Sequence, residues 1–326
     1  MRVRAAEKLE LIRLVEGSSL SVRQTLKEIG LSRSTFYAWY KRFLEDGPDG
    51  LENRKPRLRA VWNRIPDRIR DHVIETALVH TELSPRELAC RITDRDGEFL
   101  SESSVYRILK AADLIESPAY ILLQAGDRFQ QPTHRRNELW QTDFTYLPVV
   151  GWGWYYLSTV LDDYSRKILA WTLSATMRVQ DVTETLDLAR VATGVDRVHV
   201  RHKPRLLSDN GPCYLAKDLA VYLAEHGLGH TRGRPYHPMT QGKIERWHRS
   251  MKNVVRLEHY YSPEALERAI ARFVEYYNHE RVHESIGNVT PDDMYHGRLR
   301  TILTRREKIK RLTLKRRKKE NLQTAA

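Results

Sequence analysis

The sequence of 326 residues has few cysteines and no long apolar run, and each absence excludes a class of protein. Its two cysteines, Cys90 and Cys213, are too few for a disulfide framework or a cysteine-rich zinc site, so we expect each to be a small buried side chain. Without a stretch of about 18 apolar residues we expect no membrane span. The first residues are charged and do not resemble a signal peptide. We therefore expect a soluble protein of a reducing cytoplasm.

Acidic residues are also too few to balance the basic ones. The 42 Asp and Glu face 55 Lys and Arg, which leaves a net charge of +13 and predicts a polyanionic partner, DNA above all. The first 60 residues carry a net +5, residues 61–127 a net −4, residues 128–297 a net +2 and the last 29 a net +10. We expect residues 298–326 to form a mobile basic arm that binds the phosphate backbone. A solvated terminus without a role is the alternative.

Residues 7–46 have the pattern of three short helices. Apolar residues recur at helical spacing, and Ser21 and Ser32 are suited to cap the second and third helix. A short turn at Gly30 followed by a polar, basic helix is typical of a helix-turn-helix. We predict a DNA-binding domain over residues 1–50, with four side chains that can face a major groove: Arg33, Ser34, Tyr37 and Lys41. A plain three-helix bundle is the alternative.

A second helical unit is expected over residues 66–116, after a basic linker at 51–65. Ser84-Pro85-Arg86-Glu87 has the composition of a capping box with proline at the first helical position. We predict a second, winged helix-turn-helix, with Arg86 and Arg107 as DNA contacts. Its net negative charge leaves a role in packing or dimerisation as the alternative.

The pattern changes after a second linker at residues 117–133. Short runs rich in aromatic and β-branched residues over 140–149, 154–161 and 167–173 predict three strands joined by hairpins. A helix over 180–192, a strand over 205–207 and a helix over 214–226 complete an α/β layer fold with a mixed sheet. Four tryptophans are expected to pack this sheet, with stacking on unpaired bases as the alternative: Trp140, Trp152, Trp154 and Trp171.

Three acidic residues lie in settings that suit chemistry. Asp143 lies inside the first strand, where a charge is costly unless something neutralises it. Asp209 follows the strand Leu206–Ser208, and sites in α/β folds often lie at strand ends. Glu245 lies early in a helix and is separated from Asp209 by 35 residues. The spacing alone is a weak signal, whereas the three settings together indicate a candidate site.

These stretches resemble the DDE transposases of bacterial insertion sequences, whose cores are similar to retroviral integrase and to ribonuclease H. The match is carried by the surroundings of Asp143, by Ser208-Asp209-Asn210-Gly211, by residues 231–252 around Glu245, and by residues 277–291. The resemblance implies a ribonuclease H-like core over residues 134–297 with a mixed five-stranded sheet. It also implies that Asp143, Asp209 and Glu245 are the catalytic and metal-binding residues. The zinc module of retroviral integrases is absent, because two distant cysteines cannot supply it.

For activity, the resemblance implies a transposase that binds the terminal repeats of a mobile element and target DNA at the bacterial nucleoid. It implies 3′-end cleavage and strand transfer with two Mg²⁺ ions, for which Mn²⁺ can substitute. Pairing of two DNA ends implies a homodimer or a larger oligomer. The rival hypothesis is a DNA-binding regulator that retains an inert core.

The helix of Glu245 carries two neighbouring stripes. One is apolar and contains Ile244, Trp247, Met251 and Val255. The other aligns cations with Glu245, which suits DNA lying along the helix, so we predict contacts from Lys243, Arg249, Lys252 and Arg256. A solvated face with Glu–Arg support is the alternative.

The remaining candidates have weaker claims to function. Asp162 and Asp163 are expected to serve a turn between two strands. His237 and His248 lie near the candidate site in sequence, where each could contact phosphate or position water, or could be structural.

Overall fold

The computed structural model describes residues 3–53, 61–115, 133–197, 199, 203–233 and 242–323. The chain divides near Trp62 into two compact units, which are considered separately. In the described parts of the chain, no helix is long and apolar enough to cross a membrane.

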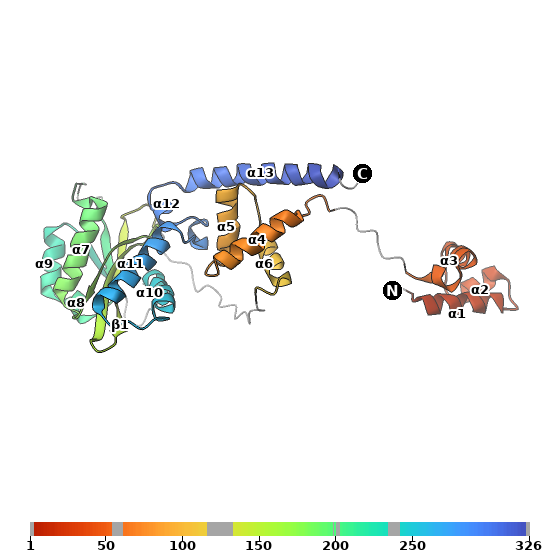
Figure 1. Ribbon diagram of the computed structural model, residues 1–326, viewed down its shortest axis with the longest axis horizontal. Coiled ribbons are helices and arrows are strands. Elements are labelled where there is room, and N and C mark those ends of the chain that lie inside the picture. The colour runs from red at the N-terminus through yellow and green to blue at the C-terminus, as the bar shows by residue number, and fades with distance from the viewer. Residues whose placement is uncertain are drawn as a thin grey trace. The chain divides into compact units, whose positions relative to one another are not determined.

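The first unit is a three-helix domain that ends in a short 3₁₀ turn (Figure 1). Its elements are α1 (Ala5–Glu16), α2 (Val22–Glu28), α3 (Arg33–Asp46) and η1 (Gly47–Leu51). Ser32 caps α3 by accepting a hydrogen bond from the Thr35 backbone N–H at 3.2 Å, as its position predicted. Gly30 has a φ of +68°, so the turn between α2 and α3 uses a conformation that favours glycine. The core joins all the elements through Ile12, Val15, Leu26, Phe36, Trp39 and Leu51.

The second unit opens with three more helices: α4 (Asp67–Val79), α5 (Pro85–Asp96) and α6 (Glu102–Ala111). The capping box at the start of α5 forms, because Ser84 and Glu87 bond each other's backbone N–H. Residues 61–115 contain no strand, so the predicted wing is not found there. The next residues of the chain, 116–132, lie outside the described residues.

A five-stranded mixed sheet forms the centre of the rest of the second unit. Its strands are β1 (Leu139–Val149), β2 (Gly153–Asp162), β3 (Ile168–Ser174), β4 (Arg205–Ser208) and β5 (Gly229–Arg232). Their order is β3-β2-β1-β4-β5, with the first three antiparallel and β1, β4 and β5 parallel. The predicted fold class is confirmed. The last strand was missed because its side chains lie largely in solvent and lack an apolar alternation.

Helices cover both faces of the sheet (Figure 1). On one face lie α7 (Val179–Thr193), α8 (Pro212–Leu215) and α9 (Lys217–Glu225), packed on a core that includes Trp140. On the other lie α10 (Gly242–Val255) and α11 (Pro263–His279), packed on a core that includes Leu147 and Trp247. The predicted apolar stripe of α10 is buried in this second core throughout. Each strand side therefore has its own apolar layer, as alternation along β1 requires.

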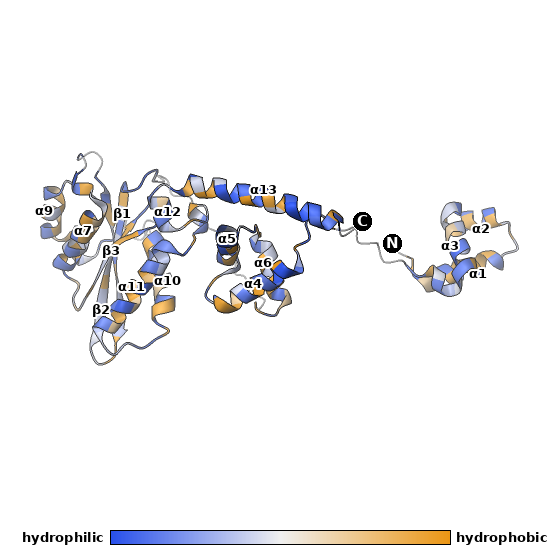
Figure 2. Ribbon diagram, turned by 45° about the horizontal axis from the view of Figure 1, so that its top comes forward, coloured by the Kyte–Doolittle hydropathy of each residue, from blue (hydrophilic) through white to orange (hydrophobic). Residues whose placement is uncertain are grey.

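The basic C-terminal segment is a helix, and the expectation of a mobile arm was wrong. After α12 (Pro291–Tyr295), α13 (Leu299–Gln323) runs past the end of α5 and contacts the segment that follows it (Figure 1). Figure 2 shows how hydrophilic α13 is along its length. Arg306 pairs with Asp94 at 2.6 Å, and Arg317 pairs with Glu98 at 2.7 Å. The acidic excess of residues 61–127 neutralises part of the arm's charge, and this lets the segment pack.

Candidate functional site

The register of two parallel strands brings Asp143 and Asp209 together. Gln141 of β1 is aligned with Leu207 of β4. Asp143 and Asp209 each follow two residues later, so the two carboxylates come from neighbouring positions of these two parallel segments. They line the same pocket, which has a volume of ≈ 490 Å³. The pairing of these two predicted residues depends on the sheet order, since β4 joins β1 only after the crossover through α7.

The third predicted residue, Glu245, is brought to β1 by the packing of α10. The Ile244 backbone N–H donates to the Gln141 side-chain oxygen at 3.1 Å. One turn further along α10, Nδ1 of the buried His248 lies 3.4 Å from a carboxylate oxygen of Asp143. Glu245 lies between these two contacts in sequence. His237 lies outside the described residues, whereas His248 touches the site directly.

The electrostatics of the three carboxylates place Asp143 at the centre. Burial raises the pKa of Glu245, and the negative charge of Asp143 raises it further, against the opposing effect of Arg249. Burial also raises the pKa of Asp209; a hydrogen bond from the Gly211 N–H opposes this, and Asp143 adds to it. Asp143 therefore repels both of its neighbours. Such a concentration of negative charge is stabilised by a cation.

The donor set can be tested against the divalent cations that the resemblance implies. Among the described residues, no group of three His, Cys, Asp or Glu side chains is already arranged as a complete metal site. The three predicted residues supply carboxylate oxygens, and the pKa is raised at two of them. Hard cations such as Mg²⁺ and Mn²⁺ prefer oxygen ligands. The chemistry of these side chains therefore fits a divalent metal.

A buried hydrogen-bond network that the sequence did not reveal holds the start of α10. Asp163 is almost fully buried and accepts from the Gln141 side-chain amide at 2.7 Å and from the Lys243 ammonium at 2.5 Å. Gln141 in turn holds the Ile244 N–H. The turn interpretation fits Asp162, which accepts from the Ser165 N–H, but Asp163 links β2 to α10.

Lys243 therefore differs from its predicted role as a DNA contact. Its side chain is mostly buried, and its ammonium group is bonded to Asp163. The spacing of apolar residues along α10 does not show that this lysine is buried while the cations further along the helix are more exposed. Arg249 and Arg256 are exposed, and Lys252 is half-buried with its Nζ 4.8 Å from the centre of the Tyr146 ring. These three stay predictions as DNA contacts.

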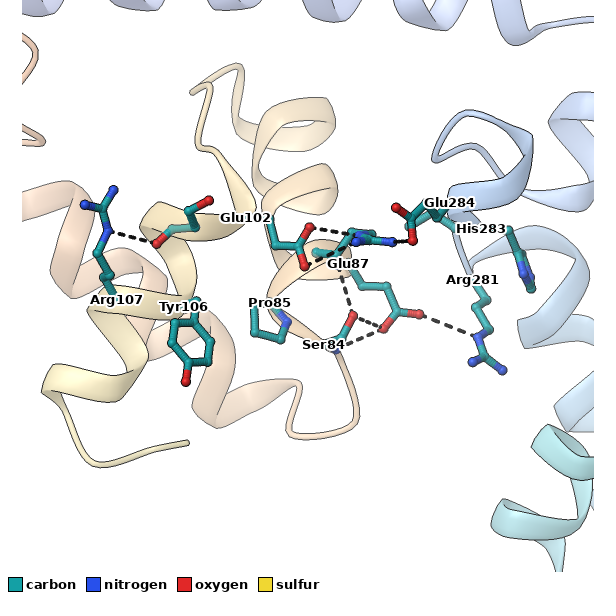
Figure 3. Close-up of a pocket in the computed structure, with 12 residues that line it drawn as sticks. Ser84, Pro85, Glu87, Glu102, Tyr106, Arg107, Arg281, His283 and Glu284 are labelled. Carbon is teal, nitrogen blue, oxygen red and sulfur yellow. Dashed lines mark hydrogen bonds and ion pairs between the residues drawn. The ribbon is translucent and has the colours of Figure 1, made fainter. Parts of the chain in front are cut away.

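The predicted DNA contacts of the helical units fall into two groups. Arg33, Ser34, Tyr37 and Lys41 are exposed on one face of α3, as a recognition helix requires. In the second unit, Arg107 is exposed, but Arg86 forms ion pairs with Glu102 and Glu284. Figure 3 shows the groove around these residues, which also holds the Arg281–Glu87 pair. Arg86 is thus paired with carboxylates, and its contact with DNA stays a prediction.

Two of the four tryptophans depart from the packing expectation. Trp140 is buried and Trp171 packs against the core. Trp152 and Trp154 are 62% and 53% exposed at the end of the β1–β2 hairpin. Trp154, unlike Trp152, lines the pocket of Asp143 and Asp209.

Comparison with known proteins shows what each region of the chain is similar to. Integrase core domain models match residues 133–238 and 226–291. A helix-turn-helix domain matches residues 7–59 and a homeodomain-like domain residues 35–109. Among solved structures, the HTLV-2 integrase catalytic core domain in complex with magnesium aligns with 50% of this chain and 98% of its own, at 20% identity and a TM-score of 0.40.

Curated relatives match the core. Transposase InsF for insertion sequence IS3A of Escherichia coli is 27% identical over 161 residues, which cover 48% of this chain and 53% of the relative. The protein of insertion sequence element IS986/IS6110 of Mycobacterium tuberculosis is 30% identical over 164 residues, or 48% of this chain and 57% of the relative. The chain spans about half the length of the curated relatives it matches. Residues 133–291 are thus similar to integrase core domains, and the curated relatives that match this region are transposases of bacterial insertion sequences.

Proposed function

We propose that this protein is a transposase that binds the terminal repeats of a mobile element, cleaves at their 3′ ends and joins them to target DNA. The observation that carries the proposal is the register of β1 and β4, which sets Asp143 beside Asp209, with Glu245 brought to them on α10. Similarity to transposases alone does not establish chemistry, whereas a carboxylate on the central strand whose charge acts on two further carboxylates supports it.

Asp143, Asp209 and Glu245 are proposed to hold two divalent cations, Mg²⁺ or Mn²⁺. Asp143 has the position of a shared ligand, because its charge acts on both of the other carboxylates. When bound, such ions supply activation of the attacking oxygen and stabilisation of the leaving oxygen. The residues of this chain would hold the scissile phosphate in line with its attacker.

The reaction would take two steps, each of which forms one phosphorus–oxygen bond and breaks another. In the first, a water oxygen attacks a phosphodiester at the element's end, and the leaving 3′ oxygen takes a proton to become a 3′-OH. In the second, that 3′-OH attacks a phosphodiester of target DNA, forming a new bond and releasing another 3′-OH. Neither step needs a covalent bond to the protein.

DNA would be held by surfaces outside the carboxylate site. The exposed face of α3 is proposed to read the terminal repeats in a major groove. On α13, the side away from α5 exposes cations at helical spacing over about 27 Å: Arg300, Lys308, Arg311, Lys315 and Lys318. This face is proposed to contact phosphates along a duplex. Pairing two DNA ends for concerted joining would require at least a dimer.

The test uses the full chain, Mg²⁺ and duplex DNA carrying the repeats that flank the gene. We expect the wild-type protein to release a 3′-OH end and join it to a plasmid, and Asp143→Asn to do neither while binding the same DNA equally. Cleavage that survives Asp143→Asn would remove the site assignment. Binding without cleavage by the wild type in either metal would favour a regulator with an inert core.

A further inference from the structure

The pocket beside Asp143 and Asp209 has walls that carboxylate chemistry does not use. Its volume of ≈ 490 Å³ lies within the range of about 300–1,000 Å³ that is typical of small-molecule sites. Apart from the two carboxylates, most of the residues that line it are aromatic: Phe144, Tyr146, Trp154, Tyr156 and Tyr214. We call it the aromatic pocket. It begins where the proposed scissile phosphate would lie, and it can accommodate a group the size of a nucleotide.

Two of its aromatic rings are open to solvent. Trp154 is 53% exposed and Tyr146 is 52% exposed. Their ring centres lie 5.3 Å apart, with planes at 83° to each other. Burying either ring in a core would stabilise the fold, so their exposure beside a polar site needs another explanation. Exposed aromatic surface of this kind marks a binding site.

A cation lies over one ring of the same pair. Nζ of Lys252 on α10 is 4.8 Å from the centre of the Tyr146 ring. An aromatic platform with an adjacent cation is the arrangement by which proteins hold single-stranded nucleic acid, since the ring stacks on a base and the cation meets its phosphate.

We propose that the aromatic pocket binds one unpaired base of the DNA strand that is positioned at Asp143 and Asp209, stacked on Trp154 with Lys252 near its phosphate. The inference rests on the proposed function for the placement of that strand. Stacking on a side chain requires a free base face, which a continuous duplex does not offer. The strand at the site would therefore be frayed or opened next to the scissile phosphate.

The hairpin provides a matched control. Trp152 is two residues away, is 62% exposed, and does not line the aromatic pocket. Trp152→Ala therefore removes a similarly exposed indole from the same hairpin and leaves the lining of the aromatic pocket unchanged. Trp154→Phe keeps an aromatic face at the position and should restore binding.

The experiment measures binding of the full chain to a short oligothymidylate and to an abasic strand of equal length. Trp154→Ala should weaken oligothymidylate binding about 5- to 100-fold, which corresponds to one base–aromatic stack, and leave abasic binding unchanged. Trp152→Ala should bind both strands as the wild type does. A strand with 5-iodouracil should cross-link to Trp154 or Tyr146 on irradiation, which locates the base independently of affinity.

Several outcomes would overturn the proposal. Equal wild-type affinity for the abasic and base-containing strands would mean that only phosphates are bound. Cross-links confined to α3 or α13 would place the base elsewhere. A change of oligomeric state in Trp154→Ala with unchanged base binding would identify the aromatic pair as a contact between protein copies. None of these assays requires DNA cleavage, so their failure is distinct from an absence of transposase chemistry.

Discussion

Arg317 near the end of α13 pairs with Glu98 near the end of α5, with a guanidinium nitrogen 2.7 Å from a carboxylate oxygen. Both side chains are buried, at 3% and 6% exposure. The same guanidinium donates to the Phe99 carbonyl at 2.8 Å. A segment that charge counting assigns to solvent is therefore fastened to a helical unit more than 200 residues earlier in the chain.

Removing this pair should destabilise the second unit. Arg317→Met leaves Glu98 in a buried position with one cation fewer, and breaking a buried pair typically costs about 3–5 kcal/mol. Urea unfolding followed by circular dichroism measures the change. Arg64→Met provides the control, because its pair with Asp67 is exposed and should contribute under about 1 kcal/mol. Equal decreases in stability in the two variants would contradict the assigned role of Arg317.

The outer face of α13 should determine salt-dependent DNA affinity. Lys308→Gln with Lys315→Gln removes two exposed cations from this face. The slope of log affinity against log salt should fall by about 0.9 for each phosphate of duplex DNA that the variant no longer neutralises. Arg268→Gln with Arg272→Gln on α11 changes the net charge equally at exposed positions and should leave the slope unchanged. Identical slopes for all three proteins would exclude α13 as a DNA-binding surface.

The network at the start of α10 should matter for catalysis more than for DNA binding. Lys243→Met removes the cation that bonds Asp163 and frees the first turn of the helix that carries Glu245. Misplacement of a reacting group by about 1 Å can cost 100-fold in rate, so we expect cleavage to slow about 10- to 100-fold at saturating DNA. Lys243→Arg should recover part of the rate.

A second buried pair provides the control for this prediction. Lys167 bonds Asp292 of α12 at 2.5 Å and is buried to a similar degree. Lys167→Met should lower stability to a similar extent while the rate per folded molecule stays near that of the wild type. If both variants lose the same activity, the effect belongs to stability and not to the placement of Glu245.

Asp292 should make stability depend on acidic pH. Burial raises its pKa, but hydrogen bonds from Lys167 and Arg298 outweigh burial and lower the pKa to about 2. Because the folded value lies below the unfolded value of about 4, the carboxylate contributes about 2 kcal/mol above pH 4, which is lost as pH falls toward 2. The difference in free energy of unfolding between the wild type and Asp292→Asn should therefore decrease as the pH falls from 4 toward 2. A gap between the two proteins that does not change with pH would contradict the prediction.

Prediction from the sequence succeeded where local pattern decides structure. The caps at Ser32 and Ser84, the apolar stripe of α10 and the strand predicted over residues 140–149 are short-range signals, and each is found as expected. It did not reveal the ion pairs of Arg86, Lys243 and the C-terminal segment. In all three cases a basic side chain is paired with an acid that lies at least 16 residues away in the chain. Counting charges along the sequence does not show which basic residue pairs with which acidic residue.

By itself the sequence determined the helix and strand periods and the basic excess, because these depend on residue type and on neighbours within a few positions. It indicated three candidate carboxylates through their settings and through a resemblance to known transposases. Only the tertiary structure decided which carboxylates meet, since Asp143 and Asp209 become neighbours through the parallel pairing of β1 with β4. The tertiary structure also decided which basic side chains form ion pairs with acidic residues of the protein and which remain exposed. The physical reason is that ion pairing and burial act through space, and separation along the chain does not limit them.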